Sequence, residues 1–353
     1  MVSHASERTR AAYLITGGAG FIGAHVAEQL LKAGARVWVI DDFNDYYDPT
    51  LKEAAVAQLA RYEHFSLYRG DIRNKHAMAC VFQDIGADLS AACERKQGGI
   101  IHLAARAGVR PSLKDPQLYF ETNVNATLTL AELAKAYGID RFVFASSSSV
   151  YGERGQNTAN PSFTGFQETD DISKPISPYA ASKIAAEQLL HTYAHLHNIQ
   201  VVALRFFTVY GPRQRPDLAI HKFTRLIDRG QSIPVFGDGS ARRDFTYIDD
   251  ILQGILAALT FDQFTGASPM EIFNLGESAT ISVSHLIALI ESALGKKATI
   301  EFHPAHPGDV SLTFANIGKA NTLLGYHPET PIEKGIQRFV DWYQTQAVPS
   351  VRA

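Results

Sequence analysis

Three glycines at a fixed spacing constrain the fold of this chain more than any other feature of its sequence. Gly17, Gly20 and Gly23 stand in the segment GGAGFIG, between the apolar run 11–16 and the segment Phe21–Lys32, whose apolar residues recur at helical spacing. Glycine lets a backbone turn sharply and approach a bound pyrophosphate, and the N-terminus of the following helix offers free N–H groups and a positive dipole. This strand–turn–helix unit predicts a dinucleotide-binding site.

An acidic residue at the end of the next strand indicates which dinucleotide. Asp41 closes the apolar segment 36–41, eighteen residues after Gly23. A carboxylate there accepts hydrogen bonds from the adenine ribose and repels a 2′-phosphate, so the sequence favours NAD over NADP. A structural turn followed by a solvated acid is the alternative. The rest of the run 41–48 lacks the alternating ligands of a calcium loop, so we expect an acidic loop there and no metal.

The order of apolar and helical segments predicts an α/β fold. Further strands are expected at 65–69, 98–105, 141–149 and 201–207, and further helices at 128–137 and 178–197. Strands that are apolar on both faces and separated by helices form a parallel sheet covered on both sides, here a Rossmann-type doubly wound sheet. After about residue 210 the chain becomes rich in turns, and we expect a smaller C-terminal α/β lobe there. Residues 84–97 and 154–174 are interpreted as excursions from this pattern.

Composition excludes several other classes of protein. The 353 residues carry 33 Lys and Arg against 36 Asp and Glu, a net charge of −3, so no basic field suggests a nucleic-acid partner. The two cysteines, Cys80 and Cys93, form no CxxC pair, which argues against a disulfide framework or a zinc site. No window approaches the ~20 apolar residues that cross a bilayer, and the first residues lack a secretory pattern. We therefore expect a cytoplasmic protein without a membrane partner, with a mobile polar tail at 1–10.

A tyrosine and a lysine form the candidate catalytic pair. Tyr179 and Lys183 are four residues apart in the predicted helix 178–197 and so lie on one face of it. Tyrosine has a reference pKa of about 10, and two cations, the Lys183 ammonium and an oxidised nicotinamide, would lower it toward neutrality. Ser147, in the serine run that ends the strand 141–149, is suited to relay a proton and bind a substrate oxygen. Taken alone, this YxxxK spacing also fits an amphipathic surface pair, and the serines a serine-rich turn.

As a set, the motifs of the chain resemble those of the extended short-chain dehydrogenase/reductase family. In chain order they are GGAGFIG, Asp41, GDIRN, HLAAxAGVR, ETNVNAT, SSSSVYG, YxxxK, LRFFTVYGP and RRDFTYIDDI, within a match that runs from about residue 11 to about residue 345. The resemblance implies a Rossmann domain at 11–180, to which the strand 201–207 returns, with tightly held and recycled NAD. It also implies that the lobe at 208–345 mainly binds a nucleotide sugar.

Two serines bear on the reaction. Family members that remove water across C5 and C6 carry an Asp-Glu pair after the serine strand, and UDP-glucuronate decarboxylases carry Glu one position before VYG. This chain has Ser148 and Ser149 at those places. The resemblance therefore favours epimerisation at C4, through a 4-keto intermediate and a transient hydride transfer. Segments 104–116, 204–224 and 234–251 look closest to the UDP-glucuronate 4-epimerases, which form UDP-galacturonate. The alternatives are an epimerase of neutral UDP-hexoses, a UDP-glucuronate decarboxylase, and an NAD-binding protein without activity.

The resemblance also assigns roles to individual residues. Arg215 offers a planar fork that suits a carboxylate, and a surface arginine after a proline-rich turn is the alternative. Arg243 matches a diphosphate-binding arginine and Asp309 an aspartate that binds the uridine ribose, whereas His306 stands where galactose epimerases have a phosphate-binding arginine. The expected cofactor-binding residues are Gly17, Gly20, Phe21, Ile22, Gly23, Asp41, Asp71, Ile72, Ala104, Ala105, Arg106, Asn123, Tyr179, Lys183 and Phe206. The expected substrate-binding residues are Ser147, Ser148, Ser149, Thr208, Arg215, Arg243 and Asp309.

A homodimer is the expected assembly. Members of the family commonly pair through two long helices that form a four-helix bundle, and here these are 125–137 and 178–197. The second carries apolar residues at Ile184, Leu189, Leu190, Tyr193 and Leu196. Because some of these must face the protein's own sheet, the sequence suggests the dimer only through the resemblance.

Overall fold

A single parallel sheet organises the chain, whose computed structural model describes residues 10–153, 163–304 and 310–347. Seven strands of these residues pair in the order β3-β2-β1-β4-β5-β6-β11. Their bounds are β1 (Ala12–Thr16), β2 (Arg36–Asp41), β3 (Phe65–Arg69), β4 (Gly98–His102), β5 (Arg141–Ser147), β6 (Gln200–Phe206) and β11 (Met270–Leu275). The predicted doubly wound sheet is thereby confirmed. Strand β11 comes from the last third of the chain, so the segment after residue 208 also contributes to this sheet.

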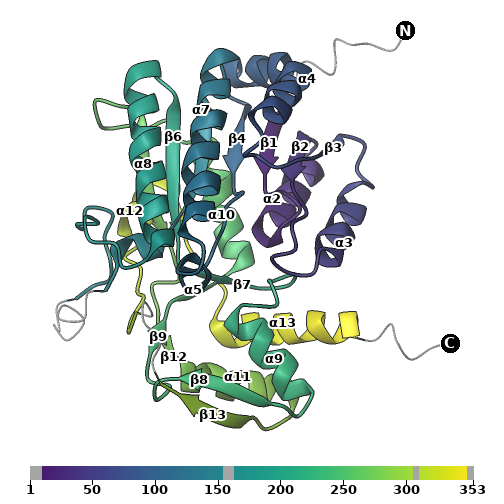
Figure 1. Cartoon of the computed structure of the whole chain (residues 1–353), viewed down its shortest axis with the longest axis vertical. Coiled ribbons are helices and arrows are strands. Elements are labelled where there is room, and N and C mark those ends of the chain that lie inside the picture. Colours follow the sequence, from purple (N-terminus) through teal and green to yellow (C-terminus); the bar gives the residue numbers. More distant parts are fainter. Residues whose placement is uncertain (1–9, 154–162, 305–309, 348–353) are drawn as a thin grey trace.

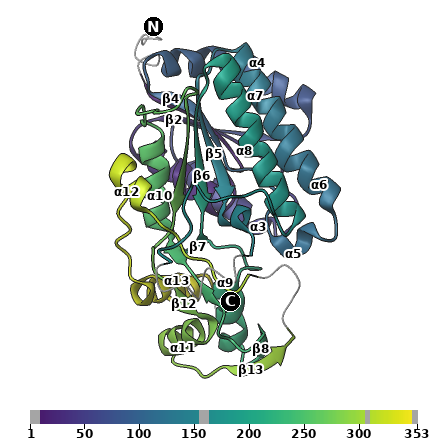
Figure 2. The same ribbon diagram turned by 90° about the vertical axis from the view of Figure 1, so that its left-hand side faces the viewer.

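Helices cover both faces of the sheet. Figure 2 shows α4, α7 and α8 on one face and α10 on the other. The first face carries α4 (Lys75–Glu94), α7 (Ala126–Ala136) and α8 (Pro178–His197). The second face carries α2 (Phe21–Lys32), α3 (Thr50–Leu59) and α10 (Ile248–Ala258). Successive residues of β1 enter separate buried clusters, with Leu14 beneath one set of helices and Ile15 beneath the other. This alternation explains why the central strands are apolar throughout.

The C-terminal lobe lies beyond the carboxyl ends of the strands (Figure 1). It contains paired short strands, with β8 parallel to β13 and β9 antiparallel to β12. Its elements are α9 (Ala219–Asp228), β8 (Ser232–Phe236), β9 (Arg242–Arg243), β12 (Ile281–Ser282), α11 (Val283–Leu294), β13 (Thr299–His303) and α13 (Ile332–Ala347). The remaining elements are α5 (Val109–Ser112), α6 (Pro116–Phe120), η1 (Glu121–Asn125), η2 (Ser148–Tyr151), β7 (Thr208–Tyr210), β10 (Phe245–Tyr247) and α12 (Gly318–Leu324). The lobe thus faces the edge of the sheet where ligands of such folds bind.

The structure corrects three sequence-based expectations about local structure. Strand β4 ends at His102, three residues earlier than the predicted strand 98–105. Most of segment 84–97 is not an excursion but the second half of helix α4, which begins after the cap at Asn74 and buries Ile85 and Leu89. Strand β5 ends at Ser147, two residues earlier than predicted, because Ser148 begins the short helix η2. The tail 1–9 and residues 154–162 lie outside the described residues.

The described residues lack both membrane-spanning and metal-binding features. None of the helices there is both long enough and apolar enough to cross a bilayer. The same part of the chain holds no group of three or more His, Cys, Asp and Glu side chains arranged to bind a metal ion. Both cysteines are free thiols, with Cys80 exposed and Cys93 buried.

Candidate active site

A cavity of about 350 Å³ opens at the carboxyl ends of the sheet strands. It lies where the strand order reverses, between β1 and β4, which is the usual ligand site of a doubly wound sheet. Most of the residues singled out in the sequence line it. They are Gly17, Gly20, Phe21, Ile22, Gly23, Asp41, Asp71, Ile72, Ala104, Ala105, Arg106, Ser147, Tyr179, Lys183, Phe206 and Arg215. We call it the large cavity.

Two of the motif glycines are required by close backbone contacts. Gly17 has a φ of +70°, and a Cβ atom there would lie 2.7 Å from the amide nitrogen of Ala104. A Cβ on Gly23 would lie only 2.3 Å from the carbonyl oxygen of Gly17. The turn therefore places the first turn of α2 against β1, where its backbone N–H groups have no partner within the helix. Such a terminus is suited to a phosphate group.

The Asp41 carboxylate is buried and held in the wall of the large cavity. Its two oxygens accept hydrogen bonds from the backbone N–H groups of Ala19 at 3.2 Å and Phe43 at 3.0 Å. They also accept one from the ammonium of Lys52 at 2.9 Å. Lys52 comes from helix α3, which the sequence reasoning did not predict, and it lines the same cavity. The acid is thus fixed for binding a sugar hydroxyl, with its charge partly balanced.

These features together fit a dinucleotide. The glycine turn leaves no room for side chains beneath the first turn of α2, and Asp41 is anchored at the end of β2. Asp71 and Ile72 follow β3 and also line the large cavity. A pyrophosphate at the helix terminus and a ribose at the second strand are the arrangement that such a constellation accommodates.

Tyr179 and Lys183 both enter the large cavity from the first turns of α8. Ser177 caps this helix by accepting a hydrogen bond from the N–H of Ala180, and Pro178 takes its first position. Both side chains lie on one face, as their four-residue spacing predicted.

The electrostatics of the pair differ from the prediction. Burial raises the pKa of Tyr179, while a hydrogen bond from Ser147 and the positive charge of Arg215 lower it. Lys183 instead donates to the carbonyl oxygen of Ala145 at 2.7 Å, and burial lowers its pKa to about 7. The cation that acts on the phenol in this structure is therefore Arg215, and a net lowering of the Tyr179 pKa would require the further charge of an oxidised nicotinamide.

The serine run places its members in different surroundings. Ser147 lines the large cavity, and its hydroxyl accepts a hydrogen bond from the N–H of Ser149 at 3.2 Å. Ser146 also lines this cavity, but its hydroxyl donates to the buried carboxylate of Glu187. Ser148 and Ser149 belong to η2 and are not among the residues that line the large cavity.

Other predicted site residues lie farther from this cavity. Asn123 is buried behind it, where its side chain accepts from the N–H of Arg106 at 2.8 Å and donates to the carbonyl oxygen of the same residue at 3.0 Å. It therefore fixes the segment after β4 rather than lining the cavity. Thr208 and Arg243 lie in β7 and β9 and are not among the lining residues. Asp309 and His306 lie outside the described residues.

Sequence reasoning missed the aromatic part of the site. Tyr46 and Tyr47 line the large cavity from the segment that was interpreted simply as an acidic loop. Tyr119, from α6, packs edge-on against the ring of Tyr179 with centroids 6.1 Å apart. The two adjacent tyrosines, five and six residues after Asp41, were the only signal in the sequence, and nothing near Tyr119 marked it.

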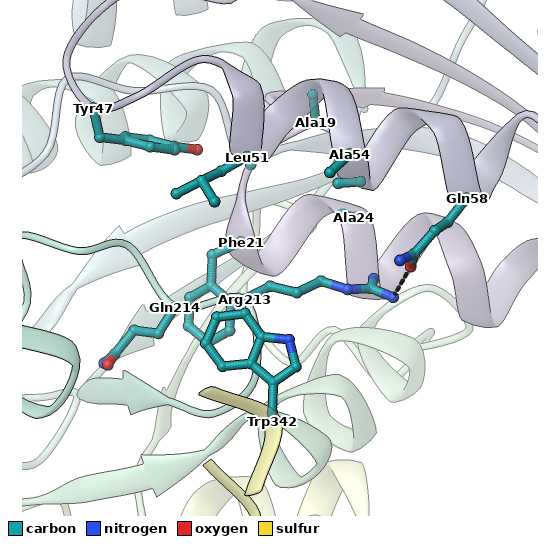
Figure 3. Close-up of a pocket in the computed structure, with 12 residues that line it drawn as sticks. Ala19, Phe21, Ala24, Tyr47, Leu51, Ala54, Gln58, Arg213, Gln214 and Trp342 are labelled. Carbon is teal, nitrogen blue, oxygen red and sulfur yellow. Dashed lines mark hydrogen bonds between the residues drawn. The ribbon is translucent and has the colours of Figure 1, made fainter. Parts of the chain in front are cut away.

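A smaller pocket of about 60 Å³ adjoins the glycine turn and shares Gly20, Phe21 and Tyr47 with the large cavity (Figure 3). Arg213 crosses from the C-terminal part of the chain to reach α2 and α3. Its Nη2 donates to Glu28 at 3.0 Å and to Gln58 at 2.5 Å. The segment 211–217 therefore contacts the cofactor half of the molecule through Arg213 as well as lining the large cavity through Arg215.

Comparison with known proteins supports the dinucleotide-binding site that this geometry indicates. Residues 13–276 match the NAD dependent epimerase/dehydratase family. The chain belongs to this family. A UDP-glucuronate 4-epimerase of Thermodesulfobacterium geofontis is 43% identical to it over 94% of this chain and 95% of that protein. Membership of this family accounts for the fold of the chain and for NAD as its cofactor.

Solved structures give the same fold. The UDP-glucuronic acid 4-epimerase of Bacillus cereus, in complex with UDP-glucuronic acid and NAD, superposes with a TM-score of 0.83 at 36% identity, covering 95% of this chain and 99% of that one. The UDP-glucose 4-epimerase of Thermotoga maritima, with UDP-glucose, gives a TM-score of 0.81 at 29% identity over the same shares of the two chains. The epimerase fold is thus common to relatives that differ in their sugar.

Proposed function

We propose that this chain is an isomerase that interconverts UDP-glucuronate and UDP-galacturonate by NAD-dependent epimerisation at C4. The observation that carries the proposal is that the guanidinium of Arg215 and the phenol of Tyr179 line one cavity. A phenol exchanges a proton with a sugar hydroxyl, and a guanidinium recognises a carboxylate through paired hydrogen bonds. The 43% identity to a UDP-glucuronate 4-epimerase supports the same substrate.

The cofactor is assigned to the cradle around the glycine turn. The first turn of α2 holds the pyrophosphate, and the Asp41 carboxylate binds the adenine ribose. Lys183, fixed by the Ala145 carbonyl, binds the nicotinamide ribose. NAD, when bound there, accepts a hydride from C4 of the sugar and returns it. The remaining predicted cofactor contacts are Phe21, Ile22, Asp71, Ile72, Ala104, Ala105, Arg106 and Phe206, whereas Asn123 acts by holding the backbone of Arg106.

Proton transfer falls to Tyr179 and Ser147. Tyr179 as phenolate takes the proton of the C4 hydroxyl, with the Ser147 hydroxyl as bridge, and the 4-keto sugar forms as the hydride leaves C4. The sugar ring then turns about its pyrophosphate linkage and presents its other face. The phenol returns its proton as the hydride comes back, and the configuration at C4 is inverted.

The nucleotide sugar is assigned to residues from both halves of the chain. Arg215 binds the sugar carboxylate, and Ser148, Ser149 and Thr208 add neutral hydrogen-bond donors around the sugar. Arg243 binds the diphosphate and Asp309 the uridine ribose. The assignments of Ser148, Ser149, Thr208, Arg243 and Asp309 rest on the match of motifs, because the first four are not among the residues that line the large cavity and Asp309 lies outside the described residues.

We further propose that the enzyme is cytoplasmic and works as a homodimer through α7 and α8. Leu190 and Tyr193 of α8 are buried in the apolar cluster between the chain's own sheet and the helices on that face. In contrast, Leu196 of α8 is 64% exposed and Leu128 of α7 is 36% exposed. Exposed leucines on neighbouring helices are suited to an apolar contact with a second copy. Sedimentation equilibrium of the purified chain tests this, and a monomer mass at micromolar concentration contradicts it.

One experiment tests the function directly. The purified protein is denatured to release NAD, and the native protein is incubated separately with UDP-glucuronate and with UDP-glucose. We expect NAD in the released fraction, UDP-galacturonate from the first substrate, and no reaction with the second. Conversion of UDP-glucose alone would favour a neutral-hexose epimerase, and release of CO2 as the main reaction would favour a decarboxylase.

The carboxylate contact has its own test. We expect Arg215→Ala to weaken binding of UDP-glucuronate by at least about tenfold and to leave binding of UDP nearly unchanged, because hydrogen bonds to charged groups contribute about 1.5–3 kcal/mol. Calorimetric titration of both ligands measures the two affinities. Equal affinity for the sugar nucleotide in variant and parent would exclude this role.

A further inference from the structure

Arg215 is held on two sides by its own surroundings. Its Nε and Nη2 atoms donate to the two carboxylate oxygens of Asp217, at 3.0 Å and 2.7 Å. Its Cζ atom lies 5.2 Å from the ring centroid of Tyr46, within the range of a cation–π contact. The guanidinium plane therefore has one edge and one face already occupied.

This arrangement leaves the outer edge of the guanidinium for a ligand. A guanidinium carries five N–H donors, and Asp217 uses the edge formed by Nε and one N–H of Nη2. Among the described residues no hydrogen bond uses Nη1. The edge formed by Nη1 and the second N–H of Nη2 matches a carboxylate in the same bidentate manner.

The aromatic neighbours fix this edge relative to the reacting atoms. The hydroxyl of Tyr46 donates to the carbonyl oxygen of Ala107 at 2.9 Å, and that of Tyr119 donates to the same oxygen at 2.8 Å. The Tyr119 ring in turn packs edge-on against Tyr179. The Tyr46 ring, which contacts the guanidinium, is therefore linked to the Tyr179 ring through the Ala107 carbonyl group and Tyr119.

We propose that Asp217 is the positioning residue that directs the outer edge of Arg215 toward the substrate carboxylate; this rests on the proposed function. Without Asp217 the long arginine side chain loses its bidentate anchor and samples several rotamers. The carboxylate is then bound in more than one orientation relative to the C4 carbonyl.

The orientation matters because the 4-keto intermediate is a β-keto acid. If the C5–carboxylate bond stands perpendicular to the carbonyl plane, that bond breaks and CO2 leaves. Its electron pair forms the C4–C5 enolate, and a proton from water then adds at C5 to give a 4-keto pentose. A guanidinium held by Asp217 keeps the bond away from this geometry, so that the hydride returns to a six-carbon sugar.

Asp217 is suited to such a test because its ion pair contributes little to folding. The carboxylate side chain is 39% exposed, and ion pairs at exposed positions contribute little to stability. Asp88, which pairs with Arg36 at 2.9 Å and is 52% exposed, provides a matched control far from the large cavity. Both alanine variants are therefore expected to fold.

The experiment measures KM and the fate of the carboxyl carbon in parent, Asp217→Ala, Asp217→Glu and Asp88→Ala. With carboxyl-labelled UDP-glucuronate, we expect Asp217→Ala to raise KM by up to about fivefold, since a partly exposed ion pair of this kind contributes up to about 1 kcal/mol to holding Arg215 in place. The fraction of turnovers that release labelled CO2 should rise with it, while the affinity for UDP stays at the parent value. Asp217→Glu should restore both quantities in part, and Asp88→Ala should match the parent.

Each other result overturns the proposal. An unchanged KM and CO2 fraction in Asp217→Ala, with an active parent, rules out positioning by Asp217. A parallel loss of UDP affinity shows a general structural effect instead. A parent that leaves UDP-glucuronate unchanged overturns the proposed function, and the role of Asp217 with it.

Discussion

Replacing Glu187 by glutamine is expected to lower the free energy of unfolding by about 3–5 kcal/mol, because it leaves the buried guanidinium of Arg205 without its counter-charge. Glu187 is fully buried and Arg205 is 1% exposed. The pair is bidentate, with Nε 3.0 Å from Oε1 and Nη2 2.8 Å from Oε2. A third hydrogen bond joins the same carboxylate to Ser146. The glutamine keeps the size and most of the shape of the side chain, so the change isolates the charge.

An exposed pair that is also bidentate, formed through Nη1 and Nη2 of Arg69, provides the control. Arg69 donates to both oxygens of Glu53 at 2.7 Å, but their side chains are 53% and 48% exposed. Glu53→Gln is expected to cost less than about 1 kcal/mol, since water solvates both groups once the pair is broken. Urea titrations of the parent and both variants, followed by far-ultraviolet circular dichroism, measure the two costs. Equal costs for the two substitutions would refute the argument from burial.

A double replacement separates stability from activity. Glu187→Leu combined with Arg205→Met removes both charges, and apolar residues of similar volume commonly replace a buried ion pair without loss of stability. We expect the double variant to recover most of the stability that the single variant loses. Its turnover should stay low, because Glu187 also holds Ser146 next to Ser147 and its charge raises the pKa of Lys183. A double variant as unstable as Glu187→Gln would contradict this.

Three further results are expected. Tyr179→Phe should lower turnover by about 10²–10⁴-fold and keep NAD, measured by epimerisation assay and by NAD released on denaturation; near-normal turnover would exclude the role of the phenol. Gly23→Ala should lose NAD, because its Cβ would meet the Gly17 carbonyl oxygen at 2.3 Å, whereas Gly266→Ala, with its nearest atom at 3.5 Å, should retain it. Burial lowers the pKa of His102 to about 3, so below pH 6.5 the unfolded chain binds more protons than the folded one and stability falls. Urea titrations from pH 7 to pH 5 measure this, and His102→Gln should flatten the profile.

The central part of the fold could be predicted because its signals are local. The glycine spacing, the apolar strands and the four-residue spacing of Tyr179 and Lys183 each depend on a few neighbouring residues. The structure accordingly brings Gly17, Asp41 and Tyr179 to one cavity. The helix over 84–94 escaped prediction because its polar residues obscured the helical spacing of Ile85 and Leu89.

The remaining features depend on contacts between distant segments. Lys52 meets Asp41 only because α3 packs beside α2, and no pattern in the segment 50–59 indicated that contact. The pairing of Glu187 with Arg205 joins a helix to a strand and likewise has no local signal. The contact of Arg215 with Asp217 is local, but the orientation of the Arg215 guanidinium also depends on Tyr46. That residue comes from a segment some 170 residues earlier in the chain.

The position of β11 in the sheet bears on how the chain is made. Strand β6 is apolar and pairs with β11 along its length, yet β11 is synthesised roughly 60 residues later, which takes about 3–12 s at ordinary rates of translation. Until then β6 presents an open row of N–H and C=O groups beside apolar side chains, which is a template for aggregation. A nascent or truncated chain that ends near residue 207 should therefore depend on chaperones, and should not accumulate as a free cofactor-binding unit.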